Sequence, residues 1–202
     1  MSSHHRQVGK MLIKKDVPQQ NWDRVWALNP LVIITTSDSE GFVNAAPYGM
    51  CMRVCHKPVM VAFSVNQKWD TYKNIKETRE FVVNVPSDNA TMLKKIMITA
   101  KHFPPRVNEL DKAGLTSLPS REIKPPRIKE CKAHFECKVD WMRDVGNHYL
   151  VVGNVVAVSI DGDCITRDYE LKIDKLRPVH YLGKLYKTIF IGVGKIHDVE
   201  KL

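Results

Sequence analysis

Long apolar runs are absent from this sequence. Its 202 residues have a hydrophobic content of 44% and a charged content of 26%, as in ordinary globular proteins. No apolar stretch approaches the roughly 20 residues that a helix needs to cross a bilayer. The N-terminal stretch MSSHHRQVGKMLIKKD also lacks the continuous apolar core of a secretory signal. We therefore expect a cytoplasmic protein without a membrane partner.

Familiar catalytic and metal-binding motifs are missing as well. The chain has no G-x-S-x-G elbow, no H-E-x-x-H, no P-loop and no paired-carboxylate motif. The stretch GVGKIH lacks both the third glycine and the following helix of a Rossmann site. The eight histidines are scattered, so their spacing predicts no metal site. These absences give no support to a hydrolase, a P-loop enzyme or a metalloenzyme.

Five cysteines are present, an odd number in a chain without an export signal, which favours free thiols over a disulfide framework. The spacings in CMRVC and CKAHFEC differ from the two-residue gaps of zinc knuckles. At the two-residue period of a strand, Cys131 and Cys137 fall on one face, so we expect buried structural thiols. A thiol role for Cys51 and Cys55 stays open.

The net charge of +9 and the pI of about 9.3 make an anionic partner plausible, but they do not choose among nucleic acid, a phosphate cofactor and acidic lipid. Aromatic residues make up 8% of the chain and are not interleaved with the basic residues, as they are in single-strand binders. No helix-turn-helix, zinc-finger or ribonucleoprotein motif occurs. A solvated basic face is favoured, and no nucleic-acid partner is expected.

Short β-rich runs dominate the first half of the chain. Leu31–Thr36 and Phe42–Ala46, separated by the polar turn SDSEG, predict a hairpin. Lys57–Asn66 is apolar on both faces and predicts a covered strand. Phe81–Val85, which reads FVVNV, predicts another buried strand. A polar stretch, WDTYKNIKETRE, precedes it and has the character of a short helix that displays a polar face.

After Pro86 the periodicity becomes helical. Apolar residues recur at three- and four-residue spacing through NATMLKKIMITA, with Ser87 or Asp88 as the cap. Five prolines then predict a surface excursion over residues 101–130 that crosses the barrel or lines a cleft. The stretches CKAHFECKVDWM and HYLVVGNVVAVSI, joined by RDVGN, predict two long strands. Together, these strands and helices predict a closed or partly closed barrel with one or two helices on its rim.

Asparagines occur at three strand ends. Asn44, Asn66 and Asn84 each lie at or within a predicted strand, where asparagine is disfavoured unless its amide makes specific bonds. Turn and bulge chemistry explains any one of them. Three such sites on successive strands favour a shared ligand.

The order NPLVIITTSDSEGFVNAAPYGM, KPVMVAFSVNQKWDTYKNIKETREFVVNVPS, LDKAGLTSLPS and GNHYLVVGNVVAV resembles the flavin reductase-like family of FMN-binding split barrels. The resemblance covers about Asn29 to Val158, with an echo in LRPVHYLGKLY. It implies a mainly β fold, a Greek-key antiparallel barrel with a few helices. No linker divides the chain, so we expect one domain over 1–202, with a core at about 25–165 and a segment 166–202 that packs on the barrel or on a dimer partner.

The resemblance implies a homodimer with FMN, rather than FAD, in a cleft near the interface. NAAPYGM would pass under the isoalloxazine, and SVNQKWDTYKN would hold the ribityl phosphate. The implied cofactor-binding residues are Asn44, Ala45, Ala46, Pro47, Tyr48, Gly49, Met50, Ser64, Val65, Asn66, Lys68, Thr71, Asn74 and Asn84.

Physical chemistry agrees with this phosphate socket. A phosphate monoester favours a cation such as Lys68, the Thr71 hydroxyl, the Asn74 amide and free N–H groups at a helix start. For Lys68, a solvated surface charge is the alternative. Two positions depart from the family pattern: Gly49 replaces a frequent serine, and Lys184 in YLGKLY replaces a usual glycine.

The implied activity is that of an oxidoreductase. Hydride would pass from NAD(P)H to flavin N5, and electrons would then pass to free flavin, ferric chelates or a protein acceptor; no catalytic side chain is required, because the flavin carries the chemistry. His148 would contact nicotinamide or substrate, unless it is a strand-end histidine with one backbone bond.

Three alternatives stay open. The first is an FMN-binding electron-transfer protein, flavoredoxin-like, with no NAD(P)H activity of its own. The second is a flavin-free basic barrel that binds nucleic acid. The third is a split barrel that holds a pyridoxal-type ligand.

Overall fold

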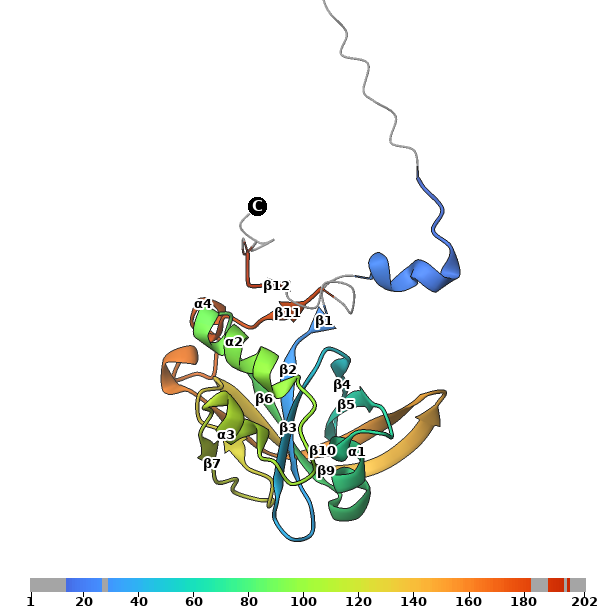
Figure 1. Ribbon diagram of the computed structural model, residues 1–202. Coiled ribbons are helices and arrows are strands. Elements are labelled where there is room, and N and C mark those ends of the chain that lie inside the picture. Colours follow the sequence, from blue (N-terminus) through green and yellow to red (C-terminus); the bar gives the residue numbers. More distant parts are fainter. Residues whose placement is uncertain (1–13, 27–28, 183–188, 195, 197–202) are drawn as a thin grey trace, which may run out of the picture.

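The structure is a computed structural model that describes residues 14–26, 29–182, 189–194 and 196 (Figure 1). Lys184 and residues 1–13 lie outside this part of the chain, so the expectations that rest on them stay predictions. The helical elements are η1 (Gln19–Arg24), α1 (Asp70–Thr78), α2 (Ala90–Thr99), α3 (Glu109–Ala113), η2 (Gly162–Cys164) and α4 (Ile173–Leu176). The strands are β1 (Asn29–Pro30), β2 (Val32–Ser37), β3 (Val43–Tyr48), β4 (Cys51–His56), β5 (Val59–Val65), β6 (Glu80–Val85), β7 (Ser117–Leu118), β8 (Arg127–Ile128), β9 (Ala133–Val145), β10 (His148–Ile160), β11 (His180–Tyr181) and β12 (Phe190–Ile191).

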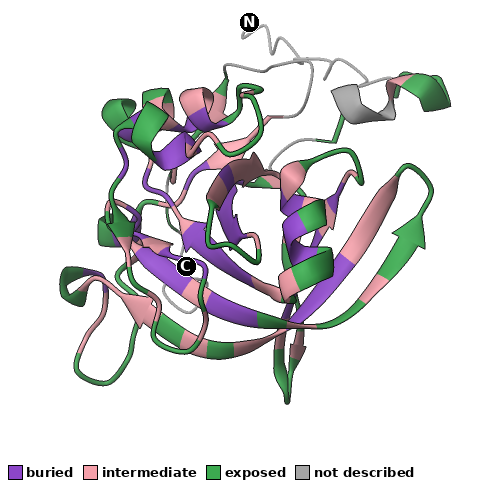
Figure 2. Ribbon diagram, turned by 60° about the horizontal axis from the view of Figure 1, so that its bottom comes forward, coloured by how far each residue is buried: buried purple, intermediate pink, exposed green. Residues whose placement is uncertain are grey.

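One antiparallel sheet of seven strands forms the body, in the order β3-β2-β6-β9-β10-β5-β4. The sheet curves round into a barrel (Figure 2). Its end strands, β3 and β4, follow each other in sequence, yet no ladder joins them within the described part of the chain. The barrel is therefore split between β3 and β4, and β3 keeps one edge open to other groups.

β2 shows that the sheet is covered on both sides. Alternate residues of a strand point to opposite faces, and Ile33 and Ile34 are both fully buried. Ile34 packs inside the barrel with Phe63, whereas Ile33 packs outside it with Ile96 of α2 and Leu110 of α3. A strand buried on both faces reads as a continuous apolar run, which is what PLVIITT is.

The strands predicted from the sequence are present, and the seven-stranded sheet contains one more, β4; the two-residue strands β1, β7, β8, β11 and β12 lie in two small sheets outside it. The predicted hairpin is β2 and β3, the next two predicted strands are β5 and β6, and the two long strands are β9 and β10. The sequence did not predict β4, which pairs with β5. Since Met52, Arg53 and Val54 are all exposed, the stretch CMRVCH lacks the alternation that identifies a strand.

The two predicted helices are α1 and α2, but the cap of α2 differs from the prediction. Asn89 caps α2, because its Oδ1 accepts the Met92 N–H at 2.8 Å. Asp88 instead accepts a hydrogen bond from Arg177 Nε at 2.7 Å. Polar α1 packs on the barrel through Ile75, which is fully buried. None of the helices in the described ranges has the length and apolarity to cross a bilayer.

The C-terminal segment returns to the start of the barrel. β11 pairs with both β1 and β12, and the Leu31 N–H donates to the Val179 carbonyl at 3.0 Å. Val179 is buried against the outer core, together with Leu31 and Ile96. The described part of this segment therefore packs on the barrel of its own chain.

The prediction of free thiols is confirmed. All five cysteines are unpaired, with Cys131, Cys137 and Cys164 buried and the other two partly exposed. Burial raises the pKa of the Cys131 and Cys137 thiols, so these side chains act as small apolar groups of the core.

Gly153 lies where β10 crosses the buried ring of Phe81. A Cβ at this position would approach Phe81 Cε1 to 2.7 Å and the Lys138 carbonyl oxygen to 3.2 Å. We expect Gly153→Ala to lower the free energy of unfolding by about 1–3 kcal/mol, because the fully buried ring must move. Urea denaturation measures the change. Gly162→Ala is the control, since its Cβ would meet nothing within 4 Å; equal stability of the two variants would contradict the prediction.

Candidate functional site

A hollow of about 250 Å³ opens at the free edge of β3. The start of α1 forms one wall and the segment that follows α2 forms another. Its lining residues are Asn44, Ala45, Ala46, Pro47, Tyr48, Trp69, Asp70, Thr71, Thr99, Ala100, Lys101, His102, Phe103 and Glu109. The excursion predicted to line a cleft therefore contributes its first residues to this hollow.

The main chain of β3 faces the hollow with acceptors. Pro47 pairs with Ile33 and Ala45 with Thr35 across β2. Pro47 has no N–H, and the Ala45 N–H donates to Glu109 Oε2 at 3.0 Å instead of to β2. Groups of alternate residues in an edge strand point away from the neighbouring strand. The carbonyls of Ala45 and Pro47 therefore point outward, whereas the one N–H at these two positions is already bonded.

A network of side-chain hydrogen bonds fixes β3 to α1 behind the hollow. Asn44 Nδ2 donates to Thr71 Oγ1 at 2.8 Å and to Thr36 Oγ1 at 3.4 Å. Asn74 Nδ2 donates to Thr36 Oγ1 at 3.1 Å. Thr36, Thr71 and Asn74 are buried and Asn44 is half-buried, so these bonds are largely removed from water and hold the helix start at a fixed place beside the strand.

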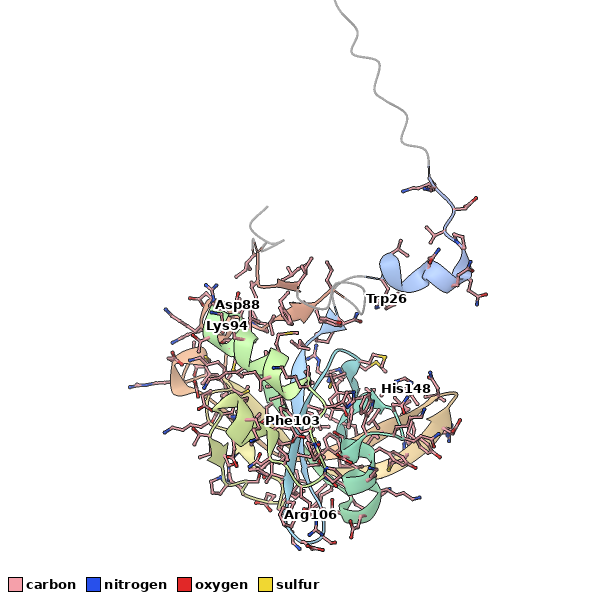
Figure 3. All side chains as sticks on the ribbon, in the orientation of Figure 1. Trp26, Asp88, Lys94, Phe103, Arg106 and His148 are labelled. Carbon is pink, nitrogen blue, oxygen red and sulfur yellow. The ribbon has the colours of Figure 1, made fainter. Side chains whose placement is uncertain are left out.

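Aromatic side chains form the rim and the floor. The rings of Trp69 and His102 stack at a centroid distance of 4.5 Å, and Phe103 follows at the centre of the view in Figure 3. The Tyr48 ring packs edge-on against Phe63 of the barrel interior. Burial raises the pKa of Tyr48, an effect that a hydrogen bond between its hydroxyl and that of Thr71 partly offsets. Tyr48 therefore stays a neutral phenol.

A second hollow of about 220 Å³ adjoins the first and shares Asn44, Asp70 and Glu109 with it. Lys73 and Arg106 bring positive charge to it. Both cations already have acidic partners: Lys73 Nζ lies 2.8 Å from Asp70 Oδ1, and Arg106 Nη2 lies 2.7 Å from Glu40 Oε1.

Glu109 lies at the junction of the two hollows. The residue is 9% exposed. Burial raises its pKa, the N–H groups of Ala45 and of Glu109 itself lower it, and the charge of Asp70 raises it further. The net shift is upward, so Glu109 is a carboxyl group that takes up a proton more readily than an exposed one. No cluster of His, Cys, Asp and Glu in the described ranges has the arrangement of a metal site.

Residues 28–186 match the family model described as flavin reductase like domain. The chain belongs to the flavin reductase-like family. An uncharacterized protein of Aquifex aeolicus is 33% identical over 172 residues, which cover 83% of this chain and 87% of that protein. As a member of this family, the protein has a flavin-linked redox function and is an oxidoreductase.

Solved structures of similar fold agree. Nitrilotriacetate monooxygenase component B from Bacillus cereus superposes with a TM-score of 0.81 at 24% identity, covering 94% of this chain and 99% of that one. Flavoredoxin of Desulfovibrio vulgaris (Miyazaki F) has a TM-score of 0.81 at 21% identity, covering 92% and 96%. At these identities the likeness concerns the fold. It confirms the predicted mainly β, antiparallel split barrel.

The hollow of this flavin reductase-like chain fits a flavin. Its outward carbonyls on β3 match the N–H on the polar edge of the ring, and its aromatic side chains match the ring faces. α1 begins without a side-chain cap, and helix geometry leaves the first N–H groups without intrahelical partners, as an anion such as a phosphate requires. Each hollow alone is smaller than the roughly 300–1,000 Å³ of ligand sites. Together, the adjoining hollows offer room for a ring and its tail.

Seven of the implied cofactor residues of this family member come together. Asn44 through Tyr48 and Thr71 line the first hollow, and Asn74 lines the second. Five others lie outside both hollows. Gly49 and Met50 follow β3, Ser64 and Val65 end β5, and Lys68 is exposed.

Asn66, Asn84 and His148 have local partners instead of a place in the hollows. Asn66 Oδ1 accepts the Lys68 N–H at 3.0 Å. Asn84 is fully buried; its amide donates to the Ile33 carbonyl and accepts the Ile128 N–H. Its amide therefore bonds main-chain groups of the core and not the ligand that it was expected to share with Asn44 and Asn66. His148 lies at the tip of the β9–β10 hairpin, apart from Phe103 (Figure 3), with Nδ1 2.6 Å from Asn147 Oδ1.

Sequence reasoning missed several lining residues. Trp69 lies inside the stretch assigned to the phosphate, but nothing in the spacing of that stretch indicated that its aromatic ring lines the hollow. His102, Phe103 and Glu109 belong to an excursion without regular periodicity, so no pattern identified which of its side chains face the barrel. The aromatic residues at the start of α1 and just after α2 were the available signal, because ligand pockets are rich in aromatic side chains.

Cys51 is expected to be unreactive. Although part of the residue is exposed, burial of its thiol raises the pKa of Cys51 to about 12, and a main-chain hydrogen bond from Met52 offsets part of the shift. Because the thiolate is the nucleophile, we expect iodoacetamide to modify Cys51 at pH 7.5 at least about 100-fold more slowly in the folded protein than in urea. Mass spectrometry of a Cys55→Ser variant isolates the signal. Equal rates in the folded and unfolded chains would restore a thiol role.

Proposed function

We propose that this protein is an FMN-dependent oxidoreductase that takes hydride from NAD(P)H and passes electrons to free flavin, a ferric chelate or a protein acceptor. One observation carries the proposal. In a chain of the flavin reductase-like family, the open edge of β3 faces a hollow that also contains aromatic rings and an uncapped helix start.

The residues of the hollow have distinct tasks in this proposal. Bound FMN supplies the redox chemistry, by accepting a hydride and releasing electrons. The carbonyls of Ala45 and Pro47 orient the ring by accepting its polar-edge N–H. Thr71 and the first N–H groups of α1 hold the phosphate. The stacked rings of Trp69 and His102 shield the hollow from water at its rim.

An FMN-binding electron-transfer protein, flavoredoxin-like and without NAD(P)H activity, is the second candidate. One observation favours it: His148, the residue expected to contact nicotinamide or substrate, lies at a hairpin tip and lines neither hollow. In this case a protein partner would reduce the flavin.

We also propose that the protein is a cytoplasmic homodimer. Apolar side chains exposed on β4 and β5 support the assembly: Met52 is 59% exposed, Val54 42% and Val59 54%. They lie on two paired strands, and groups of exposed apolar side chains are typical of protein interfaces. The hollow is open to solvent in the single chain, which leaves space for a second copy beside it.

The visible absorption spectrum tests the proposed activity. Purified protein with added FMN is expected to show a bound-flavin spectrum that bleaches on anaerobic addition of NADH or NADPH. The nucleotide that bleaches it identifies the donor. Bound flavin that bleaches with dithionite but with neither nucleotide would support the electron-transfer protein. A chain that holds neither FMN nor FAD would contradict both candidates.

FMN affinity tests the phosphate site. Thr71→Val removes a hydroxyl at the start of α1, and the loss of a hydrogen bond to a charged group is expected to weaken FMN binding by about 1.5–3 kcal/mol. Lys68→Ala is expected to cost less, about 0.2–1 kcal/mol, because exposed charges are screened. Fluorescence quenching of FMN measures both affinities. Lys76→Ala, on the exposed side of α1, is the control; unchanged affinity of Thr71→Val would contradict this placement.

A further inference from the structure

We propose that Glu109 is a positioning residue that sets the reduction potential of the bound flavin and links this potential to pH. The inference rests on the proposed function, since it requires a flavin in the hollow. It concerns a residue that no motif identifies.

The geometry places the Glu109 carboxyl against the polar edge of the hollow. Glu109 begins α3, which Asn108 caps by accepting the Leu110 N–H at 2.9 Å. The side chain turns to β3, where Oε2 accepts the Ala45 N–H at 3.0 Å. The same strand offers the neighbouring carbonyls that accept the ring N–H in the proposed function. The carboxyl therefore lies beside the part of the hollow that binds the polar edge of the ring.

The surroundings of Glu109 provide no bonded cation in the described part of the chain. The charge of Asp70 acts on Glu109, and Asp70 pairs with Lys73. Arg106 pairs with Glu40. The charged and titratable groups that face Glu109 across the two hollows are Asp38, Tyr48, Asp70, Lys73, Lys101, His102 and Arg106. Since no bonded cation among the described residues neutralises it, a negative charge on Glu109 acts on a ligand in the hollow.

The charge of the Glu109 carboxyl affects the reduction of a flavin bound in the hollow. A hydride from reduced nicotinamide brings two electrons and one proton, which leaves one extra negative charge in the hollow. A proton from water neutralises that charge, either on the ring or on Glu109. An ionised Glu109 opposes the extra negative charge, whereas a neutral Glu109 does not. Because burial raises its pKa, Glu109 changes between these two forms above the usual carboxyl range.

Glu109→Gln tests the inference, because the amide oxygen keeps the bond to the Ala45 N–H and the charge is lost. Each protein is loaded with FMN, and its potential is measured by dithionite titration against a reference dye from pH 5.5 to 8.5. At pH 8.5 the variant is expected to favour the reduced flavin at least tenfold more than the wild type, which is about 30 mV for a two-electron couple. The difference is expected to shrink as pH falls and Glu109 of the wild type becomes neutral.

Two further variants separate charge from structure. Glu130→Gln is the control: Glu130 also accepts a main-chain N–H, from Thr116 at 3.0 Å, but it lines neither hollow, so its potential is expected to match the wild type. Glu109→Asp keeps the charge, shortens the reach and is expected to retain the low potential. If Glu109→Gln does not fold, the pH dependence of the wild-type potential is the test. The potential of the bound flavin is expected to fall more steeply with rising pH than that of free FMN, and an equal slope would overturn the link to pH.

Measurements of the potential and of FMN binding distinguish failure of the inference from failure of the proposed function. Tight FMN binding together with equal potentials of wild type and Glu109→Gln at every pH would overturn the inference and leave the proposed function intact. A shift of the same size from pH 5.5 to 8.5 would overturn the link to pH. Absence of FMN binding by the wild type, measured by fluorescence, would overturn both.

Discussion

The free edge of β3 is the constraint on which the site depends. A sheet edge presents main-chain groups that must find partners, and here the strand contains a proline that removes one donor and an alanine whose N–H is bonded to a buried carboxylate. What remains is a short row of carbonyl acceptors facing a hollow. An edge of this kind cannot extend the sheet, and it suits a planar ligand that carries an N–H on its rim.

The remaining elements hold that edge in place. Asn44, Thr36 and Thr71 connect β3, β2 and α1 through partly buried hydrogen bonds, so the helix start is held beside the strand. On the other side, the segment after α2 is held at both ends, by the stack of His102 on Trp69 and by Arg106, whose guanidinium lies 4.7 Å from the centroid of the Phe42 ring. The hollow is thus built from three parts of the chain that meet only in the folded barrel.

Much of the architecture could be predicted because burial leaves a periodic pattern. PLVIITT and FVVNV are covered on both faces and read as continuous apolar strands, and the spacing of Met92 and Ile96 indicates a helix on the sheet. β4 was not predicted because most of its side chains are exposed at the edge of the sheet. Of the cofactor residues that the resemblance implies, the β3 segment and Thr71 line one hollow, whereas Asn84, equally polar and equally placed in a strand, is a core residue bonded to main-chain groups.

The sequence by itself determined the mainly β class, the hairpins, the two helices and, through ordered motifs, the flavin reductase-like family, because these depend on local patterns and on their order. Only the tertiary structure decided which side chains share the hollow. Lys68 and His148 carry suitable chemistry but lie outside it, while Glu109 and His102, in a proline-rich stretch without periodicity, lie within it. The physical reason is that a strand or helix fixes its own repeat, whereas the position of an irregular segment depends on contacts with residues far away in the chain.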